Sequence, residues 1–247
     1  MDKNTLTSWK SDRSFFTSGH LKIIACLTMF LSHLAQSNLL YSLGYIKFAD
    51  FSMLIGRVAM PIYCFMLAQG MLLTKDKKLY LKRLFIFALV SEIPYDLAFR
   101  DTIFEYYNQN VILTLFLGAL LIYVWQLIED TQGQVYFKIG LMALMEILFC
   151  FIAQWMFTDY DVKGIVAISL LYLSFRNKFL TALSLILGFY FEAYVRGYEL
   201  YIPYVVYLSI PLILLYNGKR GKYPKYGFYL FYPGHLLLIY FLKLVLL

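Results

Sequence analysis

Charged residues are scarce in this chain. Only 15% of its 247 residues are Asp, Glu, Lys or Arg, whereas 61% are hydrophobic. A soluble domain carries roughly 25% charged residues, so this composition excludes one and indicates a protein that crosses the bilayer several times. Spans of about 20 residues joined by short loops would use nearly the whole chain. We therefore expect an all-α, polytopic helical bundle in the plasma or inner membrane, with a cytoplasmic or interfacial segment at 1–20 and one transmembrane domain at 21–247.

Cysteine is also scarce, and the three cysteines lie inside apolar runs without paired spacing. Neither a disulfide framework nor a zinc site is therefore expected, and no metal is predicted. The net charge of +7 is not gathered on a soluble basic module, so the lipid bilayer is an expected partner and nucleic acid is not. No internal repeat is recognisable, which disfavours inverted-repeat transporter folds. The first 20 residues are polar and no A-x-A site follows, so we expect no cleaved signal peptide.

Nine apolar runs are candidate spans, and the sixth and seventh are short enough to be half-helices. They are 21–40, 51–74, 80–99, 111–128, 138–157, 162–175, 179–195, 200–216 and 227–247. With a cytoplasmic N-terminus, fifteen of the 22 Lys and Arg residues fall in inner segments. The external segments then hold only Lys47, Arg100, Lys163, Arg196 and Lys243. The positive-inside rule therefore predicts about nine spans, with the N-terminus inside and the C-terminus outside.

A histidine lies inside the first apolar run, LKIIACLTMFLSHLAQS. His33 follows Lys22 by eleven residues, which returns both to nearly the same face of a helix, three turns apart. We expect His33 at midspan, where an imidazole needs a partner or a water-filled cavity, because an unsatisfied polar group in hydrocarbon costs several kcal/mol. Such a group indicates a functional site. The alternative is a hydrogen bond that only fixes helix packing.

Ionisable residues also interrupt the second and third runs. Arg57 lies in the outer half of the second run and needs a carboxylate, a carbonyl cluster or an anionic ligand, unless it reaches out to the headgroups. In the third run Glu92, Asp96 and Arg100 recur every four residues and so share one helical face near its outer end. Two carboxylates in a low-dielectric setting suit proton handling. The alternative is a charge-neutralising network that assembles helices, in which Arg57 pairs with Glu92 or Asp96.

Weaker signals come from three further parts of the sequence. Asn110, Thr114 and Gly118 would align on one face of the fourth run, a spacing typical of close helix packing as well as of ligand contact. Asp159 lies in an external loop, TDYDVKG, where aspartate commonly caps a helix. His235 follows a Pro-Gly pair, which we expect to break the last helix, and it could contact a ligand.

Six ordered sequence blocks resemble the TraX family of membrane proteins, known from conjugative pilin acetylation and related to the acyltransferase-3 family of integral membrane acyltransferases. They are LKIIACLTMFLSHL, IGRVAMPIYCFMLAQG, RLFIFALVSEIPYDLAF, NVILTLFLGALL, TDYDVKGIVAISLLYLSFR and FYPGHLLLIY. The acyltransferase-3 hallmark is an arginine followed eleven positions later by histidine in the first span. Lys22 and His33 occupy these positions here. The resemblance implies that His33 is a catalytic base.

The chain departs from the family pattern at two places. Ser32 precedes the histidine where TraX proteins have Asp, and Gln69 stands where they usually have Glu. An acidic neighbour would increase the basicity of the imidazole. We expect Glu92 or Asp96 to supply the missing carboxylate, so these two join His33 as candidate catalytic residues.

The resemblance implies transfer of an acyl group, most simply acetyl from acetyl-CoA, to an amine or hydroxyl of a peptide, pilin-like protein or glycan. Lys22 and the basic inner loops would attract the anionic CoA, and Arg57 or Asn110 would stabilise the oxyanion. The remaining candidate substrate contacts are Thr114, Asp159 and His235. The alternatives are a proton-coupled transporter, with a relay of Glu92, Asp96, His33 and Arg57, and a noncatalytic membrane assembly factor, for which Ser32 argues.

Overall fold

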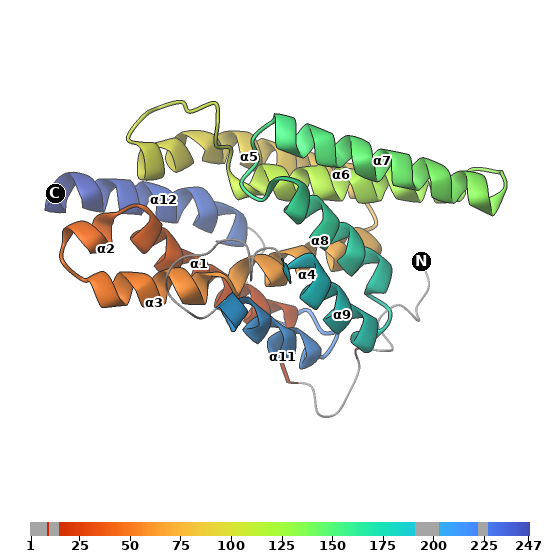
Figure 1. Ribbon diagram of the computed structural model, residues 1–247, viewed down its shortest axis with the longest axis horizontal. Helices are drawn as coiled ribbons and strands as arrows, with labels where there is room; N and C mark the ends of the chain where they lie inside the picture. The colour runs from red at the N-terminus through yellow and green to blue at the C-terminus, as the bar shows by residue number, and fades with distance from the viewer. Residues whose placement is uncertain (1–8, 10–14, 191–202, 222–226) are drawn as a thin grey trace.

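The computed structural model describes residues 9, 15–190, 203–221 and 227–247. Within these ranges all regular structure is helical, apart from two isolated β-bridges. The helices are α1 Ser18–Gln36, α2 Leu39–Ser42, α3 Ile46–Gly56, α4 Ala59–Leu73, α5 Lys77–Arg100, α6 Val111–Asp130, α7 Val135–Trp155, α8 Asp161–Ser174, α9 Lys178–Gly188, the 3-10 helix η2 Pro203–Leu208, α11 Ser209–Leu214 and α12 Gly227–Leu246 (Figure 1).

Five helical segments of the described chain are long and apolar enough to cross a membrane. These are α1, α6, α7, α12 and the run Ile46–Leu73, which contains both α3 and α4. Helix α5 has 24 residues but carries more charged side chains, while α8, α9 and α11 are shorter. The all-helical membrane class is thus supported, and the nine spans and the cytoplasmic N-terminus stay predictions.

Some of the sequence predictions fall on residues outside the described ranges. Among the basic residues of the topology prediction, these are the inner residues Lys3, Lys10, Arg13, Lys222 and Lys225 and the external residue Arg196. Most of the segment 1–20, the end of the run 179–195 and the start of the run 200–216 also lie outside the described ranges.

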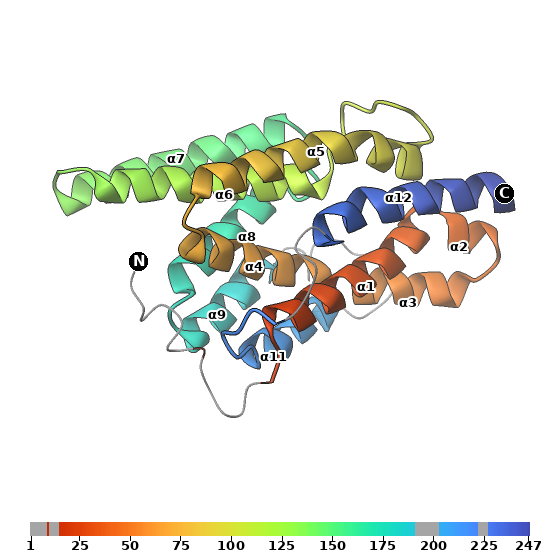
Figure 2. The ribbon, with the colours of Figure 1, turned by 180° about the vertical axis from the view of Figure 1, so that it is seen from behind.

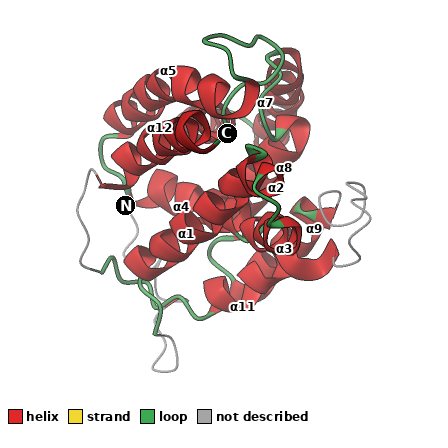
Figure 3. Ribbon diagram, turned by 90° about the vertical axis from the view of Figure 1, so that its left-hand side faces the viewer, coloured by secondary structure: helices red, strands yellow, loops and turns green. Residues whose placement is uncertain are grey.

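Helix α1 packs against several other helices. It contacts α3, α4 and α12, and the end-on view shows these helices gathered together (Figure 3). Helix α5 packs along α12 and α6, and the hairpin of α6 and α7 extends away from this group (Figure 2). The first and last helices of the chain are therefore neighbours, and α5 closes over α12 from the other side.

The run Ile46–Leu73 is interrupted at Arg57. Helix α3 ends at Gly56, Arg57 and Val58 form a turn, and α4 begins at Ala59. Pro61 explains the break, because proline has no N–H to donate to the Arg57 carbonyl four residues earlier and its ring crowds that carbonyl. The sequence alone predicted one continuous span here.

The break is packed closely against α1. A Cβ on Gly56 would lie 2.1 Å from Cβ and 2.5 Å from Oγ of Ser32. Only glycine allows this approach of the two backbones, in the manner of small residues at membrane helix interfaces. Gly56 therefore sets how near Ser32, and with it the end of α1, lies to α3.

Trp9 shows that the N-terminal segment does not stay wholly outside the bundle. Its side chain is 0% exposed, and its Nε1–H donates to the Phe175 carbonyl at 2.7 Å. The indole packs against the rings of Phe65, Phe175 and Tyr216, with centroids 5.0, 5.4 and 5.9 Å away. This one residue of the predicted tail is thus a core residue.

Replacing Gly56 with Ala should destabilise the protein. Ser32 would have to move away from the new methyl group, and such overpacking costs about 1–3 kcal/mol. Thermal unfolding in detergent measures the effect. Gly140→Ala is the matched control, because a Cβ at Gly140 meets no atom within 4 Å and should leave stability equal or slightly higher. Equal melting temperatures for the two variants would contradict the close packing.

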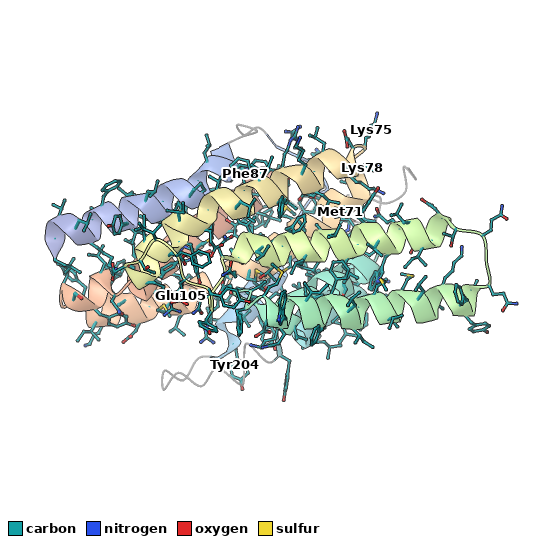
Figure 4. The ribbon with its side chains drawn as sticks, turned by 90° about the horizontal axis from the view of Figure 1, so that it is seen from above. Met71, Lys75, Lys78, Phe87, Glu105 and Tyr204 are labelled. Carbon is teal, nitrogen blue, oxygen red and sulfur yellow. The ribbon has the colours of Figure 1, made fainter. Side chains whose placement is uncertain are left out.

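The predicted orientation can be tested at the two ends of α5. Lys78 lies in its first turn, near Lys75, and Glu105 lies in the loop beyond its last turn (Figure 4). In a Cys150→Ser background, whose two other cysteines are buried, a cysteine at Lys78 should react with a membrane-impermeant maleimide only after the cells are opened. A cysteine at Glu105 should react in intact cells. The reverse pattern would reverse the predicted orientation.

Candidate functional site

A polar cavity of about 130 Å³ opens where α1, α3, α4 and the loop before α8 meet. Its lining includes Met29, Met60 and Val111 as apolar residues. The polar side chains that line it are Ser32, His33, Gln36, Arg57, Tyr63, Asp159 and Tyr160. Polar groups from four separate segments thus converge on one small space, which is typical of a binding or catalytic site.

His33 lies in the last turn of α1, three residues before the end of the helix, and not at midspan as predicted. Its Nδ1 is 2.7 Å from Nε2 of His235 on α12. The ring planes are inclined by 18° and the centroids are 5.0 Å apart, so the two imidazoles meet edge to edge. This hydrogen bond joins residues 202 positions apart in the sequence.

His235 lies within a continuous helix, because α12 runs through Pro233 and Gly234 without ending. The helix break predicted there is wrong. Its Nδ1 is 2.7 Å from the Phe231 carbonyl oxygen one turn earlier, and its side chain is only 4% exposed. Both ring nitrogens are thus engaged, and His235 is not part of the cavity lining. Its expected role as a direct ligand contact gains no support from this placement.

Aromatic rings enclose the histidine pair on the side away from the cavity. Phe99 and Tyr232 approach the His33 ring edge-on, with centroids 5.1 and 6.1 Å away. Phe231 lies nearly parallel to the His235 ring at 4.7 Å, and Phe30 lies 6.1 Å from it. These rings leave the cavity as the polar side of His33.

The cavity also contains two charged candidates from the sequence. Arg57 reaches it from the turn between α3 and α4, and Asp159 from the loop before α8. That loop is held against the bundle by a hydrogen bond of 3.0 Å from the Gln109 N–H to the Phe157 carbonyl. A cation and an anion therefore face the same small space as the imidazole, so the site can bind a polar group and stabilise charge.

The two carboxylates of α5 lie apart from this cavity. Glu92 accepts a hydrogen bond from the Asn110 side-chain amide, and Asp96, fully buried, accepts one from the Glu105 backbone N–H at 2.8 Å. The pairing of Arg57 with Glu92 or Asp96 is corrected by these partners. Neither carboxylate orients His33, because that position is taken by His235. One oxygen of each, Glu92 Oε1 and Asp96 Oδ1, is buried without a hydrogen-bond partner in the described chain.

The polar residues of α6 have structural partners. Asn110 is the N-cap of α6, where its Oδ1 accepts from the Ile112 N–H at 3.0 Å and its Nδ2 donates to the Ala88 carbonyl at 2.9 Å. Thr114 Oγ1 lies 3.5 Å from the Tyr160 N–H. A Cβ on Gly118 would meet Ile168 at 2.5 Å. Asn110 thus bonds to α5, whereas Thr114 and Gly118 pack closely on the α8 region, and neither polar residue lines the cavity.

Lys22 lies at the opposite end of α1 from His33. The eleven residues between them correspond to roughly 16 Å along a helix, so Lys22 cannot reach the cavity. Its Nζ lies over the Phe228 ring at 5.5 Å from the centroid. The lysine and the histidine therefore mark two separate regions of one helix.

Sequence reasoning missed several cavity residues. Tyr63 hydrogen-bonds with Cys26 at 3.2 Å, and Tyr160 lines the cavity beside Asp159. Gln36 was not among them, because the helical period of the sequence places it on the face of His33. Nothing local marks the tyrosines, because the core contains many aromatic residues of the same kind.

No metal centre accompanies the cavity in the described ranges, where no three His, Cys, Asp or Glu side chains gather in a geometry that could hold an ion.

Apolar helices around a polar, histidine-lined cavity indicate an integral membrane protein. The chain belongs to the TraX family, whose model, described as TraX protein, matches residues 18–243. It is also 27% identical over 252 residues to the "Probable fimbrial assembly protein FimC, serogroup H1" of Dichelobacter nodosus, an alignment that covers 94% of this chain and 97% of that protein. No solved structure matches the chain.

A double-mutant cycle should confirm the partners of Glu92. Glu92→Ala and Asn110→Ala should be coupled by about 0.5–3 kcal/mol in the free energy of unfolding, because the two side chains share a hydrogen bond. Glu92→Ala and Arg57→Ala should be additive within about 0.5 kcal/mol, since they share no partner. Unfolding in detergent gives both values. Strong coupling of Glu92 to Arg57 instead would restore the original pairing.

Proposed function

We propose that this protein is a membrane factor for the assembly of a surface filament of the fimbrial or pilus kind. Membership of the TraX family and similarity to a probable fimbrial assembly protein along nearly the whole of both chains support this role. The bundle of apolar helices is consistent with action inside the membrane.

We further propose that the factor acts by acyl transfer, most simply of acetyl from acetyl-CoA. The observation that carries this chemistry is the His33 ring, bonded through Nδ1 to His235 and lining the cavity that also contains Arg57 and Asp159. A held imidazole beside a cation is the arrangement that proton removal and oxyanion stabilisation need. The TraX resemblance and the proposed relation to the acyltransferase-3 family favour the same reaction.

The size of the cavity limits what it would hold. Sites for drug-sized ligands measure roughly 300–1,000 Å³, and this cavity is about 130 Å³. It would therefore take only the acyl thioester end of the donor and the nucleophilic group of the acceptor. Lys22, at the other end of α1, would attract the anionic end of the CoA.

In the reaction, the amine or hydroxyl of a peptide, pilin-like protein or glycan attacks the acyl carbon while its proton passes to His33 Nε2. Arg57 stabilises the negative charge on the carbonyl oxygen. The carbon–sulfur bond then breaks, and His33 returns the proton to the departing thiolate. Asp159 lies where it would bind the acceptor.

A noncatalytic assembly factor is the second candidate. The relative is named for assembly alone, and Ser32 replaces the acidic neighbour of the family histidine. In this case the hydrogen bond between His33 and His235 would only join α1 to α12.

Replacing His33 with Ala should abolish acyl transfer without unfolding the protein. A positioned general base contributes roughly 10²- to 10⁴-fold, whereas one polar contact between membrane helices is worth only about 1 kcal/mol. Purified protein in nanodiscs would be incubated with labelled acetyl-CoA and a pilin-like peptide, and label on protein, lipid or peptide counted. His20→Ala is the matched control, because His20 lies on the same helix but is exposed.

Filament assembly in cells separates the candidates. If His33→Ala protein assembles filaments as well as the wild type, and neither transfers label, the chain is a noncatalytic factor. If the wild type moves protons or a solute and consumes no acyl donor, it is a transporter.

A further inference from the structure

The hydrogen bonds of His235 determine where its proton lies. A carbonyl oxygen can only accept, so the 2.7 Å contact with the Phe231 carbonyl requires a hydrogen on His235 Nδ1. A neutral imidazole carries one such hydrogen, so His235 Nε2 is bare and accepts. The 2.7 Å contact between the rings then requires His33 Nδ1 to be the donor.

The same argument continues into the cavity. Once His33 Nδ1 carries the hydrogen of a neutral ring, His33 Nε2 has a free lone pair. We propose that His235 is a positioning residue that holds His33 in the tautomer whose bare Nε2 serves as the proton acceptor. This role rests on the proposed acyl transfer and names the residue that would make His33 a base in that reaction.

The surroundings favour the neutral pair. In the described chain, the hydrogen-bond partners of the two rings are each other and one carbonyl, with no carboxylate among them. A cationic imidazole without a hydrogen-bonded carboxylate is costly inside a membrane protein, although Asp159 and Arg57 line the same cavity. Phe231 supplies the carbonyl and also packs its ring parallel to His235, so one helical turn of α12 sets both the proton and the orientation of that ring.

The tautomer of His33 determines whether its ring presents a donor or a proton acceptor to the cavity. Free histidine in water prefers a hydrogen on Nε2, which would present a donor to the cavity instead of a base. With His235 in place, a proton taken up at Nε2 creates a cation whose Nδ1–H already donates to His235, and charge strengthens that hydrogen bond. His235 therefore stabilises the state that follows proton transfer without touching the substrate.

Nitrogen NMR of histidine-labelled protein in nanodiscs tests the tautomer directly, with no donor or acceptor present. The chain has three histidines, and a His20→Gln variant removes the exposed one. The wild-type spectrum should show His33 with hydrogen on Nδ1 and a bare Nε2. His235→Leu should shift His33 toward the opposite tautomer, and His235→Gln, whose side-chain oxygen can accept near the former Nε2 position, should restore the first.

Activity gives an independent readout. His235→Leu should lower kcat at least about tenfold, as loss of an orienting partner does elsewhere, with little change in KM, and His235→Gln should recover most of it. A His33 tautomer unchanged in His235→Leu, or a bare Nδ1 in the wild type, would overturn the positioning role. A correct tautomer in a protein that never transfers an acyl group would overturn the proposed reaction and leave the assignment of the protons standing.

Discussion

One hydrogen bond, between His33 and His235, ties the first long helix of the chain to the last. In an apolar bundle each buried polar atom must find its partner within the protein, so two histidines on neighbouring helices restrict how those helices rotate. With His33 turned toward α12, the rest of that helical face, including Ser32 and Gln36, lines the polar cavity. The site therefore depends on a contact between helices that are remote in sequence.

The same constraint acts elsewhere in the bundle. Ser169 on α8 donates to Glu146 on α7 at 2.9 Å, and Gln126 on α6 donates to the Tyr172 hydroxyl on α8 at 3.0 Å. These hydrogen bonds satisfy polar atoms that would otherwise face lipid or apolar side chains. The cavity differs because several polar side chains meet there around open space. This difference separates a candidate site from polar contacts that only assemble helices.

The family histidine has a different neighbour in this chain. Where the TraX pattern places an acid beside it in sequence, Ser32 packs closely on Gly56 and the imidazole bonds to a second histidine. A neutral acceptor orients the ring and fixes its proton, but it adds no negative charge to increase basicity. The proposed base therefore relies on position more than on electrostatic activation.

Local patterns in the sequence were enough for the class, the family and half of the site. Apolar runs and helical periodicity depend on near neighbours, so they indicated the helices and the face of His33. They also marked Arg57 and Asp159 as candidates, which the structure brings to one cavity. They could not show that the run Ile46–Leu73 is divided into α3 and α4 at Arg57. Nor could they show that Glu92 bonds to Asn110 or that His235 is the partner of His33. Those outcomes depend on which helix faces pack together. That choice is made by the fit of side chains such as Gly56 against Ser32, between segments that no local pattern connects.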